Sequence, residues 1–178
     1  MNEDYFKKVY EFFKEFAEKI DGYLIASLDY LIVRVIKDDI IIEYQFGNRD
    51  TTPSFVLSTP LELNNVFFEI YKKKILNLEV DLIKYKEIKD YSVFIPSYEN
   101  EKTMLLMDRI FNDFEYKDIL EKYLKKWAIQ YKYNTLCIGL DRSIDPIIQK
   151  KVSIEELYDV YHLIKETKEV LLYYNKKI

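Results

Sequence analysis

The chain has 178 residues, of which 49% are hydrophobic and 33% are charged, and its formal net charge is −4. This composition excludes an intrinsically disordered chain, and the acidic balance excludes a bulk positive field that would attract nucleic acid or anionic lipid. No stretch approaches the ~20 apolar residues of a membrane span, and the N-terminus lacks the basic start and apolar run of a signal peptide. We therefore expect a cytoplasmic protein with a single domain over residues 1–178.

The residue counts show an excess of aromatic side chains. There are 17 Tyr and 11 Phe but only 3 Gly, 1 His and 1 Cys. The single cysteine, Cys137, excludes an intrachain disulfide. Abundant Lys and Glu with few thermolabile side chains are typical of hyperthermophile proteins, whereas an AT-rich genome would produce much the same bias toward Lys, Ile, Tyr and Asn.

An amphipathic helix is predicted over residues 4–20. Apolar side chains recur there at steps of three and four residues, and charged side chains fill the opposite side. Gly22 is a natural stop for this helix. The apolar stripe is unusually aromatic, and its members are Phe6, Val9, Phe13, Phe16 and Ile20.

The strongest β signal lies in residues 30–46. Two β-branched and aromatic runs flank a short polar break, which predicts a β-hairpin. With Asp38 and Asp39 in the turn the register follows, and a slip of one residue would send the apolar side chains to the wrong face. The expected cross-strand neighbours are Val35 with Ile42, Val33 with Tyr44, Leu31 with Phe46, and the ion pair of Arg34 with Glu43.

Other strands are predicted on both sides of this hairpin. Residues 23–28 precede the hairpin and are expected to join it. Residues 54–58 follow a turn signal at 47–50 and lie between Pro53 and Pro60, and proline is tolerated at a strand start or edge. The remaining predicted strands are residues 66–71, residues 76–82 with an acidic outer face, and residues 91–95.

The pattern changes from strands to helices near Ser97. Residues 100–114 and 117–126 carry apolar side chains at helical spacing, as one bent helix or as a helical pair. Residues 127–133 and 135–140 predict a second short hairpin that turns near Tyr133 and Asn134. The last helix begins at Ser153, which forms a capping box with Glu156, and runs to about residue 173.

This order of elements predicts the α+β fold class. We expect an antiparallel β-sheet with the hairpin of residues 30–46 at its centre, packed against helices. A second short hairpin and a long capped C-terminal helix complete the fold. Within the single domain, a strand-rich lobe would span residues 1–97 and a helix-rich lobe residues 98–178.

The sequence contains no recognisable catalytic or metal-binding motif. A glycine-rich phosphate loop, a Cys-x-x-Cys pair and a His-Glu-x-x-His motif are all absent. His162 lies in the last helix with no identifiable nucleophile or orienting carboxylate. The polar loops at residues 47–50 and 141–146 could bind a metal or an anion, but turn chemistry explains the same residues. We therefore expect no enzyme, no cofactor and no metal site.

Lysines beside aromatic residues form a candidate nucleic-acid patch. Single-stranded nucleic acid is bound by aromatic stacking along a cationic groove, and Tyr44 and Phe67 would be further stacking platforms. The acidic net charge and the lack of an RNA-binding signature argue against this hypothesis, and lysine runs also guard sheet edges. The patch consists of Tyr71, Lys72, Lys73, Lys74, Lys125, Lys126 and Trp127.

The aromatic excess supplies the leading functional hypothesis. Tyr and Phe are enriched at protein interfaces, although codon bias and burial in the core explain the same excess. We expect a non-enzymatic protein-interaction or assembly module whose partner is another protein or a second copy of itself. The alternatives are nucleic-acid binding through the patch above and binding of an apolar small molecule in a cavity between sheet and helix. The candidate interface residues are Tyr5, Tyr10, Phe12, Tyr173 and Tyr174.

Overall fold

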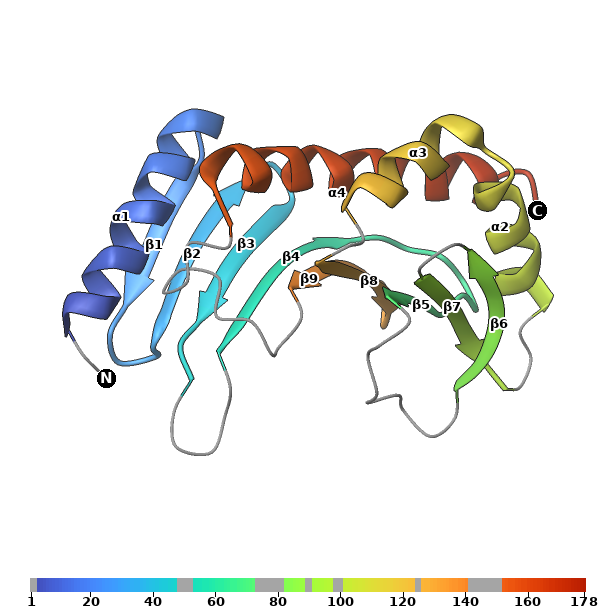
Figure 1. Cartoon of the computed structure of the whole chain (residues 1–178), viewed down its shortest axis with the longest axis horizontal. Helices are drawn as coiled ribbons and strands as arrows, with labels where there is room; N and C mark the ends of the chain where they lie inside the picture. Colours follow the sequence, from blue (N-terminus) through green and yellow to red (C-terminus); the bar gives the residue numbers. More distant parts are fainter. Residues whose placement is uncertain are drawn as a thin grey trace.

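An antiparallel sheet with helices on one side forms the fold (Figure 1). The computed structural model describes residues 3–47, 53–72, 82–88, 91–97, 101–123, 126–140 and 152–178. The helices in these ranges are α1 (Glu3–Ile20), α2 (Glu101–Phe111), α3 (Phe114–Tyr123) and α4 (Ile154–Asn175). In Figure 1, α4 runs across the curved sheet from α1 at one end to α2 and α3 at the other. The predicted α+β class, with its antiparallel sheet and long C-terminal helix, is confirmed.

Nine strands in the described ranges pair in the order β1-β2-β3-β4-β9-β8-β5-β7-β6, and every neighbouring pair is antiparallel. The first four are β1 (Tyr23–Ser27), β2 (Ile32–Lys37), β3 (Ile40–Gln45) and β4 (Ser54–Pro60). The other five are β5 (Phe68–Lys72), β6 (Leu82–Ile88), β7 (Tyr91–Pro96), β8 (Trp127–Lys132) and β9 (Thr135–Leu140).

The hairpin β8–β9, from the C-terminal half of the chain, occupies the middle of the sheet. β9 pairs with β4 and β8 pairs with β5, so this hairpin separates two strands that follow each other in the sequence. The predicted position of the hairpin of residues 30–46 is therefore wrong. Its strands, β2 and β3, are second and third from one edge rather than central.

The predicted register of the β2–β3 hairpin is confirmed. Asp38 and Asp39 form the turn, Arg34 lies opposite Glu43, and the Arg34 Nε–H donates to Glu43 Oε2 over 2.7 Å. At the open end of the hairpin, the Phe46 amide donates to the Leu31 carbonyl over 2.8 Å. The apolar pairs Val33 with Tyr44 and Val35 with Ile42 are as expected.

One row of apolar side chains crosses the helix-covered face of the sheet. Eight of its nine members are aliphatic, and they alternate with the residues of the opposite face because successive strand residues point to opposite sides. At the far edge the row ends in Lys86, whose Nζ lies 3.4 Å from Asp108 Oδ1 of α2. The row contains Leu24, Val35, Ile42, Leu57, Ile138, Ile129, Ile70, Val93 and Lys86.

Helix α4 covers this row with its own apolar face. Burying such side chains contributes roughly 1.5–3 kcal/mol each relative to exposure, so this layer stabilises the fold substantially. The buried side chains of α4 include Leu157, Val160, Leu163, Ile164 and Leu171.

The neighbouring row on the other face of the sheet is mixed in character. It includes Ile36 and Ile41 near one edge, Cys137 in the middle and Phe94 beyond it. Glu69 also belongs to this row and is buried, with its carboxylate accepting a hydrogen bond from Gln130 Nε2 on β8.

The connection from β4 to β5 is tied to the central hairpin through Tyr131. The Tyr131 hydroxyl donates to the Leu61 carbonyl and accepts from the Leu63 amide, both over 2.9 Å. A buried hydroxyl with such partners fixes the path of the chain around the inserted hairpin.

The end of α1 is set by Asp21 and Gly22 together. Asp21 takes the left-handed conformation, with φ 54°, and the Gly22 amide donates to the Ala17 carbonyl over 2.8 Å. Gly22 is needed for a different reason: a Cβ there would lie 2.8 Å from Val35 Cγ1. The predicted glycine stop is confirmed, but close approach to β2 is what selects glycine.

The remaining predictions for the second half of the chain are largely confirmed. Helices α2 and α3 are a pair rather than one bent helix, and the β8–β9 turn lies at Tyr133 and Asn134. Ser153 Oγ accepts from the Glu156 amide over 3.1 Å, as a cap should. Glu156 itself does not close the box, because its carboxylate accepts from Trp127 Nε1 over 3.1 Å and pairs with Lys126. The sequence pattern missed β6, and most of the predicted strand at 76–82 lies outside the described residues.

Candidate interaction surface

The two edges of the sheet differ in how they are protected. Natural sheets guard their edges with lysine, proline, bulges or inward charges, because an open edge can pair with another chain. The edge strand β6 carries Lys84, Lys86 and Glu87, and its pairing with β7 shifts between Lys84 and Lys86, which marks a β-bulge. The other edge strand, β1, reads Tyr-Leu-Ile-Ala-Ser and has no charge, no proline and no shift of register.

Large apolar side chains are exposed at both ends of β1. Tyr23, at its start, has 69% of its surface exposed, and Leu28 and Tyr30, just after its end, have 56% and 77% exposed. Ile25, at the middle of the strand, is half-buried beside Arg34 of β2. We call Tyr23–Ser27 together with Leu28 and Tyr30 the β1 edge.

Helix α1 covers β2 more fully than it covers β1. Val33 and Val35 of β2 are completely buried, whereas their β1 neighbours Ala26 and Leu24 are exposed and half-buried respectively. The outer side of β1 therefore extends beyond the cover of α1.

The positions of side chains around α1 agree with this arrangement. Phe16 contacts Tyr161 of α4, with ring centroids 6.4 Å apart, so this flank of α1 faces α4. Tyr10 lies about a third of a turn away from Phe16, at roughly 100° per residue, and so lies on a flank of α1 that faces away from α4. Tyr10 is half-buried.

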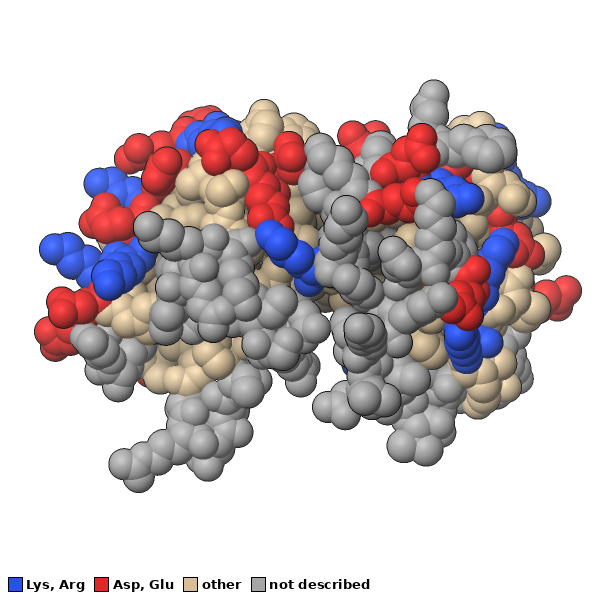
Figure 2. All heavy atoms as spheres, viewed as in Figure 1, with Lys and Arg blue, Asp and Glu red and all other residues tan. Residues whose placement is uncertain are grey.

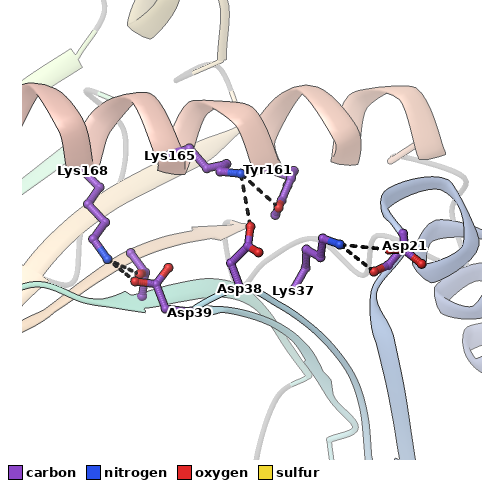
Figure 3. Close-up of polar contacts among 8 residues, drawn as sticks. Asp21, Lys37, Asp38, Asp39, Tyr161, Lys165 and Lys168 are labelled. Atoms are coloured by element: carbon purple, nitrogen blue, oxygen red, sulfur yellow. Dashed lines mark hydrogen bonds and ion pairs between the residues drawn. The ribbon is translucent and has the colours of Figure 1, made fainter.

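Side-chain contacts hold the start and end of β1 in place, and Figure 3 draws the one at its start. Lys37 Nζ donates to the Asp21 carbonyl over 2.9 Å and lies 3.2 Å from Asp21 Oδ2, which ties β2 to the turn before β1. At the other end, the Tyr30 amide lies 3.4 Å from Ser27 Oγ. These contacts position the β1 edge from within the monomer.

The largest polar cluster drawn in Figure 3 joins the β2–β3 turn to α4. Lys165 Nζ lies 3.3 Å from Asp38 Oδ2, and Lys168 pairs with Asp39 and donates to Thr59 Oγ1 over 3.2 Å. The hydrogen bond from Lys168 holds the pKa of Asp39 below its ordinary value. These side chains have partners within the chain, so the arrangement is that of a structural tie.

A second polar group is buried between β7, α3 and α4. The Tyr116 hydroxyl donates to Thr167 Oγ1 over 2.8 Å, and burial strongly raises its pKa. Burial and the nearby Glu121 raise the pKa of Tyr91 to about 12. Within the described ranges the Tyr91 hydroxyl has no hydrogen-bond partner.

The five candidate interface residues lie in three different surroundings. Tyr5, Phe12 and Tyr174 pack against the core, and Tyr5 also bonds to Tyr44 while the Tyr174 hydroxyl lies 3.1 Å from Asp113 Oδ2. Tyr173 is exposed and lies under Lys177, 3.6 Å from Nζ to the ring centroid. Tyr10 is half-buried on α1, and the structure does not bring the five residues together into one patch (Figure 1). Their role at an interface stays a prediction.

The candidate nucleic-acid patch is only partly within the described residues. Trp127 is buried and cannot offer its face to a base, Tyr44 is likewise buried, and Lys126 is paired with Glu156. On the face shown in Figure 2, Lys and Arg alternate with Asp and Glu among the described residues and form no large basic area. Lys73, Lys74 and Lys125 and the side chains of Tyr71 and Lys72 lie outside the described part.

Groups suited to catalysis or metal binding are scattered. No cluster of three or more His, Cys, Asp or Glu suited to a metal ion occurs in the ranges given above. His162 is exposed beside Tyr158, with ring centroids 4.5 Å apart, and burial raises the pKa of the Cys137 thiol. The loop of residues 141–146 and most of the turn at 47–50 lie outside the described residues.

Comparison with known proteins gives a likeness in fold. No protein-family model matches the chain, and no curated protein matches it in sequence. One solved structure shares the fold. It is the crystal structure of the mycobacterial trehalose monomycolate transport factor A, TtfA, with a TM-score of 0.56 and 11% sequence identity. The match covers 88% of this chain and 94% of TtfA.

Helix composition adds one further observation. Among the helices described, none is long and apolar enough to span a bilayer.

The sequence pattern missed the β1 edge because a strand's position in a sheet depends on its neighbours. The available signal was the contrast between the uncharged Tyr23–Ser27 and the lysine-bearing Leu82–Ile88.

Proposed function

We propose that this chain is a non-enzymatic interaction and assembly module that docks a protein partner on the β1 edge. The proposal rests on the difference between the two edge strands. β6 carries lysines and a β-bulge that hinder pairing with another chain, whereas β1 has no charge and no bulge. An exposed edge presents unpaired backbone N–H and C=O groups, and strand addition satisfies them through main-chain hydrogen bonds.

Two further observations support the proposal. Three of the exposed large apolar residues, Tyr23, Leu28 and Tyr30, lie at the ends of β1, where they would add side-chain contact to main-chain pairing. The fold is also like that of a protein described as a transport factor.

The test compares assembly of the wild type with that of two charge variants. Ile25→Glu places a carboxylate in the middle of the β1 edge, where Arg34 of the same chain can accommodate it. Ile83→Glu is the matched control, because Ile83 is an exposed isoleucine on the opposite edge strand. Both variants should retain the wild-type circular dichroism spectrum.

Native mass spectrometry of the untagged proteins gives the result. We expect the wild type to form a discrete assembly of fixed stoichiometry, Ile25→Glu to lose it and Ile83→Glu to keep it. A wild type that assembles neither with itself at about 100 µM, well above a micromolar Kd, nor with another protein retained during purification would contradict the proposal. So would an assembly that Ile25→Glu leaves intact.

The same sample also tests the two alternative functions suggested by the sequence, nucleic-acid binding and binding of an apolar small molecule. Retained nucleic acid, seen as excess absorbance at 260 nm and lost as salt rises, would favour the lysine–aromatic patch. A discrete added mass of an apolar compound would favour a ligand between sheet and helix.

A further inference from the structure

We infer that the strand docked on β1 is the β1 strand of a second copy of this chain, antiparallel, with Ile25 opposite Ile25 of the other copy. This inference rests on the proposed function and names the partner of the same edge. The pairing would join two nine-stranded sheets into one continuous sheet across a two-fold axis.

The side chains of β1 complement themselves in this register. Around a centre at Ile25, Tyr23 lies opposite Ser27 and Leu24 opposite Ala26 of the other copy, so each large side chain faces a small one. Opposite residues of an antiparallel pair share a face of the sheet. The proposed register meets this requirement. Leu24 and Ala26 are both on the helix side, beside Val35 and Val33.

The charges of β1 favour a second copy over an unrelated strand. A two-fold axis at Ile25 pairs the same five-residue segment of both copies, so a charge on that segment would lie within a few residues of the like charge of the other copy. β1 has no charged residue among its five, and this register pairs all five. The edge strand β6, with two lysines and a glutamate, lacks this property.

The exposed apolar residues explain how so short a strand could hold a dimer. Five paired residues bury little area compared with the ~1,200–2,000 Å² of a stable interface. At each end of the seam, however, the two-fold axis brings Tyr23 of one copy to the side of Leu28 and Tyr30 of the other. The three exposed side chains then contribute at both ends of the seam.

Cysteine cross-linking tests the register directly. The variants are made in a Cys137→Ser background, which removes the chain's only cysteine. Directly opposite residues of an antiparallel pair have Cα atoms about 4.5–5.5 Å apart, within the range of a disulfide. Ile25→Cys should therefore cross-link to itself under mild oxidation.

Two partner variants serve as internal controls. In the proposed register the Cα atoms of two copies of residue 23 are separated by four residues of strand, about 13 Å. Tyr23→Cys alone and Ser27→Cys alone should therefore not cross-link, whereas a mixture of the two should. Cross-linking by either variant alone would overturn the register, and the absence of a cross-link in all of these samples would overturn the pairing of two copies.

The mass of the assembly and the charge variant complete the test. We expect a mass of two chains, and we expect Ile25→Glu to raise the dimer dissociation constant about 10- to 100-fold, because two carboxylates then lie opposite each other. An assembly with a different protein that Ile25→Glu disperses would overturn the second-copy inference and leave the proposed function standing. An assembly that Ile25→Glu leaves unchanged would overturn both the second-copy inference and the proposed function.

Discussion

At the scale of single residues, the buried hydroxyls of Tyr91 and Tyr116 should have opposite effects on stability. Tyr116 donates to Thr167, whereas Tyr91 has no hydrogen-bond partner within the described ranges. A buried polar group without a partner costs free energy, and a satisfied one contributes about 1 kcal/mol. Tyr116→Phe should lower the free energy of unfolding by about 1 kcal/mol, and Tyr91→Phe should leave it unchanged or raise it.

Urea titration followed by circular dichroism measures both changes. Tyr133→Phe is a suitable control, because Tyr133 is almost fully exposed in the β8–β9 turn and should have no effect. Equal losses from Tyr91→Phe and Tyr116→Phe would mean that Tyr91 has a partner of its own.

At the scale of elements, the tie between the β2–β3 turn and α4 should make stability depend on pH. The pKa of Asp39 is lowered in the folded state, chiefly by its hydrogen bond to Lys168. A lowered pKa stabilises the fold above the unfolded value of about 4, and the contribution is lost as the pH falls. Because both side chains are partly exposed, the effect should stay below about 1 kcal/mol.

A double-mutant cycle isolates this pair. Asp39→Asn should lower the melting temperature slightly at pH 7 and have no effect near pH 2, where the wild-type carboxyl is also neutral. In a Lys168→Met background, Asp39→Asn should have little effect at either pH. A loss that persists unchanged in that background would show that Asp39 acts through another partner.

At the scale of the whole molecule, the inserted hairpin should make the two halves of the chain unfold together. Trp127, the only tryptophan, lies on β8 and packs against Phe55 of β4, with ring centroids 5.7 Å apart. Its fluorescence should therefore report on contact between the first four strands and the central hairpin. A single domain predicts one transition, with the same midpoint by Trp127 fluorescence and by far-ultraviolet circular dichroism. Separate midpoints would mean that the two parts fold independently.

The sequence by itself determined the local elements and the register of the best hairpin. Alternation around Asp38 and Asp39 allowed one register with a buried face, so the pairs of Val35 and Arg34 could be predicted. The helix stripe of α1 and the Ser153 cap are likewise local, since each depends on residues within one or two turns.

Only the tertiary structure decided which strands lie at the edges. The insertion of β8–β9 between β4 and β5 depends on long-range pairing that no local pattern encodes, and it moved the hairpin of residues 30–46 away from the centre. The same pairing left β1 at an open edge and β6, with its lysines, at the other. Whether an uncharged strand is a core strand or a docking site depends on its neighbours, and for that reason the candidate surface emerged from the fold rather than from the sequence.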